Sequence, residues 1–557
     1  MSEIESKKLF LSGIEHFKQK NFFLAVEKFE KALVFCPERV SILENLAIAY
    51  FKDNEFQKCE DILNKLIELG KDSLKIFDLK FKVLKKLDKI KELKLYIDNN
   101  FNSKKLDPKY KIIKNFLYPS FFQDQNDIDK TREEFSKSLN HLTNKIDIKL
   151  TLDKDTIDPP IFNLSYDQYE NLELNKKIVD LYRKIYPELN QNFVRKNDND
   201  KIKIGFISEF FSNHTIGKLY QGIIFKLDKS KFEIYVFHSE KTKKSPIFDK
   251  FKNAEISLNI RNVILPSKFK EKIDIINNKK LDIVFFPDIG MSAEFYFLSY
   301  IRFAKAQFTS WGHPITTSNS SIDYFLSSKL LETENAKNRF SEKLILSEYL
   351  PMYFYKPNVL NLLSANQLII KNKYFCSQNL VKVHPHFDQI IKKILKEDKK
   401  AQIIFIKDKN EIISKKLFER FKKNIPINYE RIIFLNKLNV EEYINLCGNS
   451  SVLLDTLYFG AGNSFHESML YGTPTVTMPT ENLKSRIVLG AYKQMKVNNP
   501  PIVFNIDDYV QKAVEIANLD GKKMLETKRY YSENAKLFLF ENDEAVKDLE
   551  RIFLKLL

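Results

Sequence analysis

The fold is decided by residues 451–479, which read SVLLDTLYFGAGNSFHESMLYGTPTVTMP. A short apolar run ends near Asp455 and is followed by a turn of small residues, a helical pattern and a second short apolar run. Short buried strands that alternate with helices are typical of a parallel, doubly wound sheet. The stretch therefore predicts a Rossmann-like α/β unit.

The same alternation continues on both sides of this stretch. The expected strands of a first series are residues 201–208, 232–239, 281–288, 306–314 and 322–328, and those of a second series are residues 374–378, 401–408, 431–435, 451–456 and 473–479. The residues after Ile506 have a helical pattern. Two such series predict two Rossmann-like halves that face a cleft, which we place at residues 199–365 and 366–557. Open α/β sheets bind ligands outside the carboxyl ends of their strands, so the turns that follow the strands are the candidate site.

Residues 6–97 repeat a helix–turn–helix pattern with a period of about 34 residues. The matching positions are Gly13, Phe22, Ala25 and Ala32 in the first copy, Ala47, Phe56, Cys59 and Leu66 in the second, and Ile90 and Leu93 in a weaker third. The pattern resembles a tetratricopeptide array, so residues 1–100 are predicted to be helical repeats. The repeats either cap the next domain or dock a partner or acceptor protein. Residues 101–198 are predicted to be a helical connecting region, with residues 166–186 as one of its helices.

The length, composition and charge of the chain limit the kinds of protein that it could be. The chain has 557 residues, of which 43% are hydrophobic and 13% aromatic, and domains usually have about 100–200 residues, so several globular cores are expected. A net charge of +17 invites a nucleic-acid partner, but the lysines are spread along the chain and Arg is scarce, which argues against one. We find no signal peptide, no spanning segment and no C-x-x-C pair among the cysteines, so we expect a soluble, cytoplasmic protein.

Two turns at the ends of expected strands carry basic residues. His214 follows the strand at residues 201–208, and its ordinary pKa near ~6.5 suits proton transfer or charge stabilisation. Gln378, Asn379 and Lys382 follow the strand at residues 374–378, just before a helix that begins near Pro385. A lysine beside a helix N-terminus suits a diphosphate.

A third turn, Phe459–Ser464, lies between a strand and a helix. Its small residues let backbone N–H groups approach an anion, and we expect Ser464 to cap the helix. Glu467 lies one turn inside that helix, where it could accept hydrogen bonds from ribose hydroxyls.

The sequence offers no cluster of metal ligands at these turns. Asp198 and Asp200 have the D-x-D spacing of metal-dependent glycosyltransferases, but they precede a strand in a polar stretch, and a metal carboxylate needs a fixed site. We interpret this stretch as linker. Lys382 and the helix ends would then stabilise a leaving diphosphate in place of a cation.

Taken together, these segments resemble the O-GlcNAc transferase / SPINDLY family of glycosyltransferases, in particular its bacterial tetratricopeptide-linked branch. The resemblance spans residues 200–555 and rests on runs that follow the family's order: GFISEFFSNHTIGKL (205–219), LDIVFFPDIG (281–290), AQFTSWGHPITTSNSSIDYFLSS (306–328), YFCSQNLVKVHPHFD (374–388) and LLDTLYFGAGNSFHESMLYGTPTVTMPTENLKSRI (453–487). It implies helical repeats followed by a GT-B fold, which is two Rossmann-like domains facing a cleft.

The resemblance also implies an activity and residue roles. The activity is a metal-independent, inverting transfer of a sugar, with UDP-GlcNAc as the expected donor and Ser or Thr hydroxyls of proteins as acceptors. His214 matches the family histidine assigned as base or as an essential cleft residue, and Lys382 matches the lysine that holds the diphosphate. The expected donor-binding residues are Gln378, Asn379, Lys382, Leu438, Gly462, Asn463, Ser464 and Glu467, and His313 and Pro314 of the Trp-Gly-His-Pro run are expected to line the cleft. No cofactor beyond the nucleotide sugar is expected.

One departure keeps alternatives open. The His-x-x-Arg element of animal members is here Tyr443-Ile444-Asn445-Leu446, which leaves the donor nucleotide undecided. A second hypothesis is transfer of glucose or another hexose to Asn, or to a small or lipid acceptor. A third is a non-catalytic scaffold in which the helical repeats are the working part.

Overall fold

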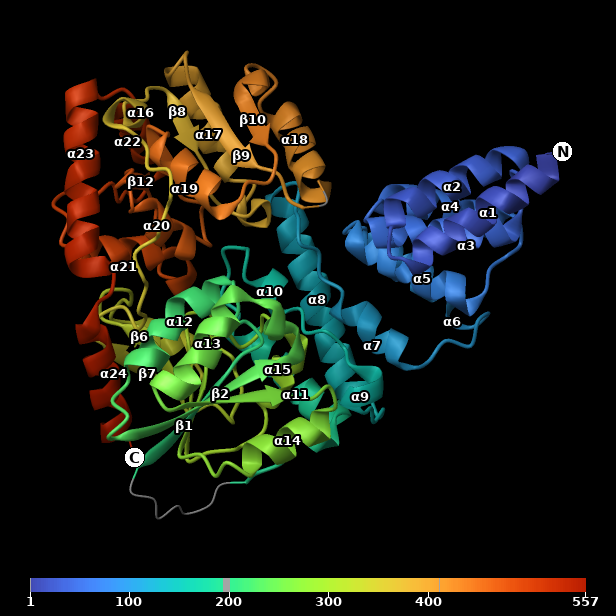
Figure 1. The fold of residues 1–557 in the computed structure, drawn as a ribbon, viewed down its shortest axis with the longest axis horizontal. Coiled ribbons are helices and arrows are strands. Elements are labelled where there is room, and N and C mark those ends of the chain that lie inside the picture. The colour runs from blue at the N-terminus through green and yellow to red at the C-terminus, as the bar shows by residue number, and fades with distance from the viewer. Residues whose placement is uncertain (1, 194–200, 410, 557) are drawn as a thin grey trace. The chain divides into compact units, whose positions relative to one another are not determined.

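The computed structural model describes residues 2–193, 201–409 and 411–556 of the chain. The chain divides into two compact units, Met1–Phe121 and Phe122–Leu557. Each unit is described by itself below (Figure 1).

The first unit is an array of helices. Its helices are α1 (Ser2–Lys18), α2 (Phe22–Phe35), α3 (Val40–Asp53), α4 (Phe56–Glu68), α5 (Leu74–Lys86), α6 (Ile90–Phe101) and α7 (Lys109–Phe116). Consecutive helices pack against one another from α1 to α7. Gly13 needs to be small because a Cβ there would lie 2.5 Å from the ring of Phe29. The prediction of helical repeats is confirmed, and the weak third copy forms a full helical hairpin, α5–α6, with Leu93 buried.

The second unit contains two sheets in which every pairing between neighbouring strands is parallel. The first sheet has the order β3-β2-β1-β4-β5-β6-β7 and the second has the order β10-β9-β8-β11-β12. The strands are β1 (Ile202–Ile207), β2 (Phe232–Ser239), β3 (Ile260–Leu265), β4 (Ile283–Phe286), β5 (Ala306–Ser310), β6 (Tyr324–Ser328), β7 (Lys343–Ser347), β8 (Lys373–Phe375), β9 (Gln402–Ile406), β10 (Ile432–Leu435), β11 (Val452–Leu454) and β12 (Thr475–Val476). The prediction of two Rossmann-like halves is confirmed.

Helices surround both sheets and connect their strands (Figure 1). The α-helices of this unit are α8 (Gln125–Lys145), α9 (Leu152–Asp155), α10 (Ile161–Leu164), α11 (Leu172–Ile185), α12 (Thr215–Lys226), α13 (Pro246–Ser257), α14 (Phe269–Asn277), α15 (Ala293–Leu298), α16 (Ala365–Leu368), α17 (Phe387–Glu397), α18 (Ile412–Asn424), α19 (Val440–Gly448), α20 (Asn463–Ser468), α21 (Ile487–Gln494), α22 (Ile506–Ala517), α23 (Gly521–Asn534) and α24 (Asp543–Lys555). Among the residues that the structure describes, none of the helices is both long and apolar enough to cross a membrane.

The two outermost strands of the first sheet, β3 and β7, are absent from the sequence prediction. Both lie at an edge of the sheet, and most of their residues are only partly buried or exposed. An edge strand can carry charged residues such as Arg261 and Lys343, so it lacks the continuous apolar run that marks a central strand of a parallel sheet.

The helix predicted at residues 166–186 is shorter than expected. It begins at Leu172, and the preceding residues form a turn. An Asp167 carboxylate oxygen accepts from the backbone N–H of Tyr169 at 2.9 Å, and the Asn171 amide donates to the backbone oxygen of Leu164 at 3.0 Å. Such local side-chain bonds offer the backbone an alternative to the helix, and the apolar spacing of the sequence does not reveal them.

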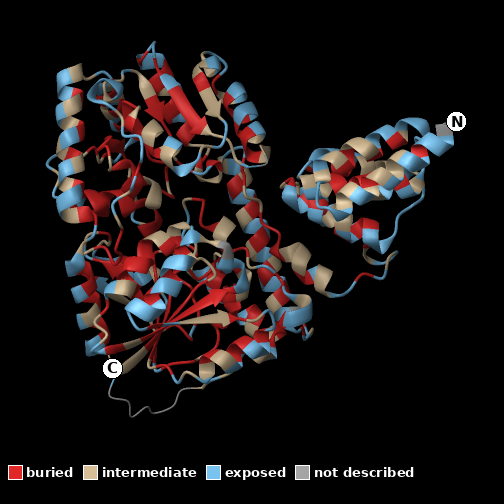
Figure 2. Ribbon diagram, viewed as in Figure 1, coloured by how far each residue is buried: buried red, intermediate tan, exposed pale blue. Residues whose placement is uncertain are grey.

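The core of the second unit runs along both sheets, where buried residues gather on the strands (Figure 2). The last helix, α24, contributes to the core of the first sheet although it follows the second sheet in sequence. The ring centroid of Phe553 lies 5.3 Å from that of Phe308 and 6.3 Å from that of Phe285. The core of the first sheet therefore continues into helices of the second half, while Phe375, Ile404 and Leu453 of the second sheet belong to a separate cluster.

Candidate functional site

Two adjoining cavities lie where the carboxyl ends of β8 and β11 face the turn after β1. The smaller has a volume of about 440 Å³ and the larger about 530 Å³. The residues shared by the two linings are Ser377, Gln378, Asn379, Asn463 and Ser464. Of the predicted donor-binding residues, Leu438 and Glu467 line the smaller cavity, and Lys382 and Gly462 line the larger one together with His214.

His214 is the N-cap residue of α12. Its Nδ1 accepts a hydrogen bond from the backbone N–H of Ile216 at 3.3 Å, and its ring stacks on Phe210 at 4.5 Å. An Nδ1 that accepts is unprotonated, so the neutral ring carries its proton on Nε2. Burial, and to a lesser extent the charge of Lys218, lowers the pKa of His214, which keeps the ring neutral. His214 therefore presents an N–H donor.

Lys382 lines the larger cavity. Its Nζ donates to Gln378 Oε1 at 3.1 Å and to the backbone oxygen of Gly460 at 3.0 Å, and it lies 4.6 Å from the centroid of the Phe459 ring. Burial lowers the pKa of Lys382 to about 8, although Asp455 opposes this shift. Both acceptors are neutral oxygens, so an anion at this point would restore the solvation that the ammonium loses by burial.

Asp455 fixes the loop in front of Lys382. One carboxylate oxygen accepts from the backbone N–H of Ala461 at 2.7 Å and the other from the Thr477 hydroxyl at 2.7 Å. Burial raises the pKa of Asp455 to about 6. The carboxylate thus holds the small-residue turn against the end of β11.

Ser464 does not cap α20, which corrects the sequence prediction. The helix begins two residues earlier than that cap would require, at Asn463, with Gly462 as its N-cap residue. The Ser464 hydroxyl instead accepts from Gln378 Nε2 at 2.7 Å, which joins the turn after β8 to the turn after β11. Asn463 Oδ1 is buried and, within the part of the chain that the structure describes, has no hydrogen-bond partner, so it is available to a ligand.

Glu467 forms a contact that the sequence did not suggest. Its Oε1 lies 2.5 Å from Lys218 Nζ, and this ion pair joins α20 of the second half to α12 of the first. Glu467 and Leu438 both line the smaller cavity. The ribose-binding role of Glu467 stays a prediction.

The two residues predicted to line the cleft, His313 and Pro314, lie in different places. Pro314 lines the larger cavity. His313 is only 2% exposed, and its Nδ1 lies 2.8 Å from the backbone oxygen of Ile289, so it lies behind the wall rather than in it. Burial lowers the pKa of His313 to about 4. His313 packs against Phe162, whose ring centroid is 5.2 Å away.

The larger cavity also has residues that sequence reasoning missed. They are the aromatic residues Phe162, Tyr166, Phe210 and Trp311, and the buried Lys484, and the ring of Phe459 from the predicted turn joins them. Lys484 belongs to the quoted run ENLKSRI, but a lysine in a chain rich in lysine gives no signal by itself. Phe162 and Tyr166 come from the connecting region, which was predicted to be helical and was not expected to contribute to the site.

A metal site is not evident in the described part of the chain. The D-x-D stretch at Asp198–Asp200 lies outside the described residues. Within them, no group of three or more His, Cys, Asp or Glu side chains is arranged to hold a metal ion.

Comparison with known proteins gives one family match and two informative relatives. The family model for glycosyl transferase family 41 matches residues 167–373. The probable UDP-N-acetylglucosamine–peptide N-acetylglucosaminyltransferase SEC of Arabidopsis thaliana is 22% identical over 376 residues, which are 65% of this chain and 38% of the relative. The UDP-glucose:protein N-beta-glucosyltransferase of Actinobacillus pleuropneumoniae serotype 5b is 24% identical over 305 residues, which are 53% of this chain and 48% of the relative. The chain thus spans less than half the length of either relative.

A solved structure matches the whole fold. A mutant of the O-GlcNAc transferase of Thermobaculum terrenum superposes with a TM-score of 0.69 at 13% identity, covering 100% of this chain and 98% of that one. This match shows that helical repeats followed by two Rossmann-like halves occur together in one known architecture.

Proposed function

We propose that the chain, whose residues 167–373 match the model of glycosyl transferase family 41, is a member of that family and transfers a sugar from a nucleoside diphosphate to a side chain of a protein. The observation that carries the proposal is Lys382, a half-buried side chain in the larger cavity whose ammonium donates to two neutral oxygens. The diphosphate of a nucleotide sugar is an anion that would fit this position. In this proposal Lys382 supplies the positive charge that a metal ion provides in other transferases.

The two cavities suggest how such a donor binds. The nucleoside would occupy the smaller cavity beside Leu438 and Glu467, and the sugar would enter the larger one beside His214. The acceptor O–H or N–H group would attack the anomeric carbon from the side opposite the diphosphate. The diphosphate would leave with the bonding electron pair, the configuration of the carbon would be inverted, and the proton of the acceptor would pass to the leaving diphosphate or to water. Lys382 would stabilise the charge that develops on the leaving group.

We infer that His214 acts as a hydrogen-bond donor and not as the base. A base needs a free lone pair on the nitrogen that faces the substrate, but Nδ1 accepts from Ile216 and leaves Nε2 protonated. The Nε2–H group can bind an oxygen of the sugar or of the acceptor.

The two roles of His214 can be separated by two substitutions. His214→Ala should lose both the helix cap and the Nε2 donor, with a loss of stability of about 1 kcal/mol and a loss of kcat of roughly 10²-fold. His214→Asn should keep the cap and recover stability, because Asn is a good N-cap residue, yet it should recover little of kcat. Thermal unfolding and initial rates check the two effects. Full activity of His214→Ala would contradict the proposed role.

The pKa of Lys382 predicts that kcat/KM for the donor falls at high pH. Because burial lowers this pKa to about 8, the ammonium is charged below pH 8 and loses its proton as the pH rises above it. The value of kcat/KM for the donor, which reports the free enzyme, should therefore fall about tenfold per pH unit above that point. A bound diphosphate favours the charged form, so the same limit in kcat should lie at higher pH. Lys382→Arg stays charged and should abolish the limit.

The sugar and the acceptor have two candidates. The first is GlcNAc from UDP-GlcNAc on Ser or Thr, which the SEC relative and the matched fold support. The second is glucose from UDP-glucose on Asn, which the bacterial relative supports at a similar identity. The helical repeats would dock the acceptor protein in either case.

Two measurements test the function and decide between the candidates. Thermal shifts with UDP, GDP and TDP identify the nucleotide, since a ligand at ~100 times its Kd adds about 2.7 kcal/mol of stability. Mass spectrometry of acceptor proteins incubated with UDP-GlcNAc or UDP-glucose then gives the sugar from the mass gained and the residue from fragmentation. A chain that neither binds a nucleotide nor modifies a protein would instead be a scaffold.

A further inference from the structure

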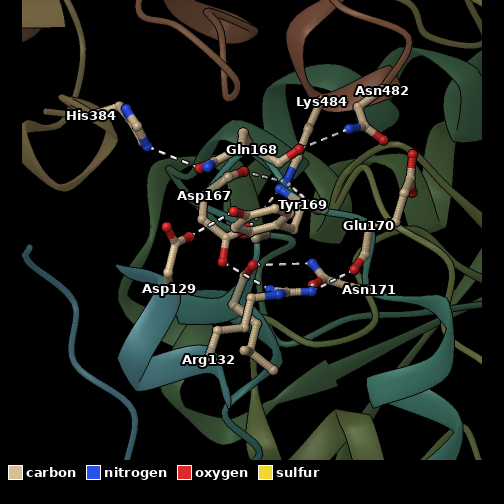
Figure 3. Close-up of polar contacts among 12 residues, drawn as sticks. Asp129, Arg132, Asp167, Gln168, Tyr169, Glu170, Asn171, His384, Asn482 and Lys484 are labelled. Atoms are coloured by element: carbon tan, nitrogen blue, oxygen red, sulfur yellow. Dashed lines mark hydrogen bonds and ion pairs between the residues drawn. The ribbon is translucent and has the colours of Figure 1, made fainter. Parts of the chain in front are cut away.

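The turn Asp167–Asn171, between α10 and α11, is held by side chains from distant parts of the chain (Figure 3). Arg132 of α8 donates to Asp167 Oδ2 at 2.8 Å and to Asn171 Oδ1 at 2.8 Å. Lys484 donates to the backbone oxygens of Asp167 and Tyr169 at 2.6 and 3.1 Å. Asp167 is 1% exposed and Lys484 is 2% exposed, so these bonds are sheltered from water.

The same segment is attached to both halves of the second unit. His384, which follows β8, lies with its Nε2 3.0 Å from Gln168 Oε1 (Figure 3). On the other side, Asn175 donates to the backbone oxygen of Thr316 at 2.9 Å, and the Ser318 hydroxyl donates to that of Leu172 at 3.1 Å. The turn is therefore a fixed bridge between the halves.

This bridge places aromatic rings in the wall of the larger cavity. The rings of Phe162 and Tyr166 have centroids 5.4 Å apart, and Tyr166 lies 5.2 Å from Phe459 of the second half. The smaller cavity, by contrast, has Tyr443 as its aromatic residue. The aromatic wall thus belongs to the side of the site that would receive the sugar and the acceptor.

Lys484 connects this wall to the loop that holds Lys382. Its backbone oxygen accepts from the N–H of Gly460 at 2.8 Å, and the oxygen of Gly460 accepts from Lys382. The side chain and the main chain of Lys484 therefore fix Tyr166 and Phe459 relative to each other.

The charged side chains that line the larger cavity, among the described residues, are all basic. Its described lining residues include two lysines, Lys382 and Lys484, and no Asp or Glu. With the diphosphate bound to Lys382, a basic side chain of an acceptor would meet the ammonium of Lys484 and no carboxylate of the described lining, whereas an apolar side chain would meet aromatic rings.

We propose that Phe162, Tyr166 and Phe459 form the acceptor subsite, which binds an extended polypeptide with an apolar side chain, and not Lys or Arg, beside the modified residue. Lys484 is the positioning residue of this subsite, because it holds the turn that carries the aromatic wall. The inference rests on the proposed transferase function.

The first arm of the test varies the acceptor. Initial rates of the full chain are measured at saturating nucleotide sugar with peptides that differ in one residue next to the modified one. Relative to Ala at this position, Phe should lower the KM of the peptide by roughly tenfold, and Lys should raise it by at least as much. Equal values of KM for Phe, Ala and Lys would overturn the proposal.

The second arm varies the wall. Tyr166→Ala and Lys484→Met should each raise the KM of the Phe peptide about tenfold and reduce its advantage over the Ala peptide, while the Kd of the nucleotide, measured by calorimetry, stays unchanged. Tyr166→Phe keeps the ring and should retain the preference for the Phe peptide over the Ala peptide. Lys523→Met, at an exposed lysine of the second half, is the matched control for the loss of one charge.

The outcomes separate this proposal from the proposed function. If the wild type neither binds a nucleotide nor transfers a sugar, the function itself is wrong. If it transfers but Tyr166→Ala changes the KM of the donor and not that of the peptide, the wall binds the sugar and the acceptor proposal is wrong. If Lys484→Met fails to fold, Tyr166→Ala alone decides, since it leaves the bonds of the turn in place.

Discussion

Replacing Lys382 by alanine should lower the rate of sugar transfer by roughly 10²- to 10³-fold, the usual cost of removing one group that stabilises developing negative charge. The side chain is half-buried, and its ammonium donates to Gln378 and to the backbone of Gly460. A desolvated cation interacts with an anion more strongly than an exposed one does. The loss should therefore appear in kcat as well as in donor affinity, because the charge on the diphosphate grows as the glycosidic bond breaks.

Two further variants make this result specific. Lys382→Arg keeps the charge and should retain more activity than Lys382→Ala, although its planar group cannot reproduce both bonds of the ammonium. Lys437→Ala removes a lysine that lines the smaller cavity and should have a much smaller effect on kcat. Transfer by Lys382→Ala at close to the wild-type rate would show that another group holds the diphosphate.

Replacing Arg420 by methionine should destabilise the second unit by about 3–5 kcal/mol, as expected when one partner of a buried ion pair is removed. Arg420 of α18 is 2% exposed and bonds both carboxylate oxygens of Asp388 on α17, at 2.9 and 3.1 Å. It also donates to the backbone oxygens of Phe122 and Val383, at 2.9 and 2.8 Å. The substitution would leave a buried carboxylate and two carbonyls without these donors. Urea unfolding followed by circular dichroism measures the loss.

A double substitution tests the physical reason for that loss. Arg420→Met combined with Asp388→Leu should be less destabilising than Arg420→Met alone, because no buried charge is then left unpaired. Lys422→Met, at an exposed position of the same helix, is the control and should change stability by less than ~0.5 kcal/mol. A loss of less than ~1 kcal/mol for Arg420→Met would contradict the view that this pair is a buried anchor.

Local sequence patterns predict most of this fold. The central strands are continuous apolar runs between turns, and this pattern locates β1, β2, β4 and β5 as well as the strands of the second sheet. The turns that follow β1, β8 and β11 meet around the two cavities, as expected for parallel strands whose carboxyl ends share one edge of a sheet. The edge strands β3 and β7 were missed because partial exposure removes their apolar signature.

The contacts that complete the site depend on residues far apart in the chain. Lys484 and the Asp167 carbonyl that it binds are separated by 317 positions, and Lys218 and Glu467 by 249. No local pattern contains such pairs, and a carbonyl acceptor has no sequence signature at all. The helix cap at Gly462 was misplaced for a related reason: Ser464 is a good capping residue, but Gln378 engages its hydroxyl instead.

The packing of α24 on the first sheet has a consequence for folding during synthesis on the ribosome. Strands β1 to β7 emerge long before Phe553, yet Phe285 and Phe308 need that ring to close their core. Until synthesis reaches this residue, the first sheet lacks the helix that covers part of its apolar face. Exposed apolar surface of this kind is what chaperones recognise. The first sheet is therefore synthesised early, but its core is completed only when the last helix has been made.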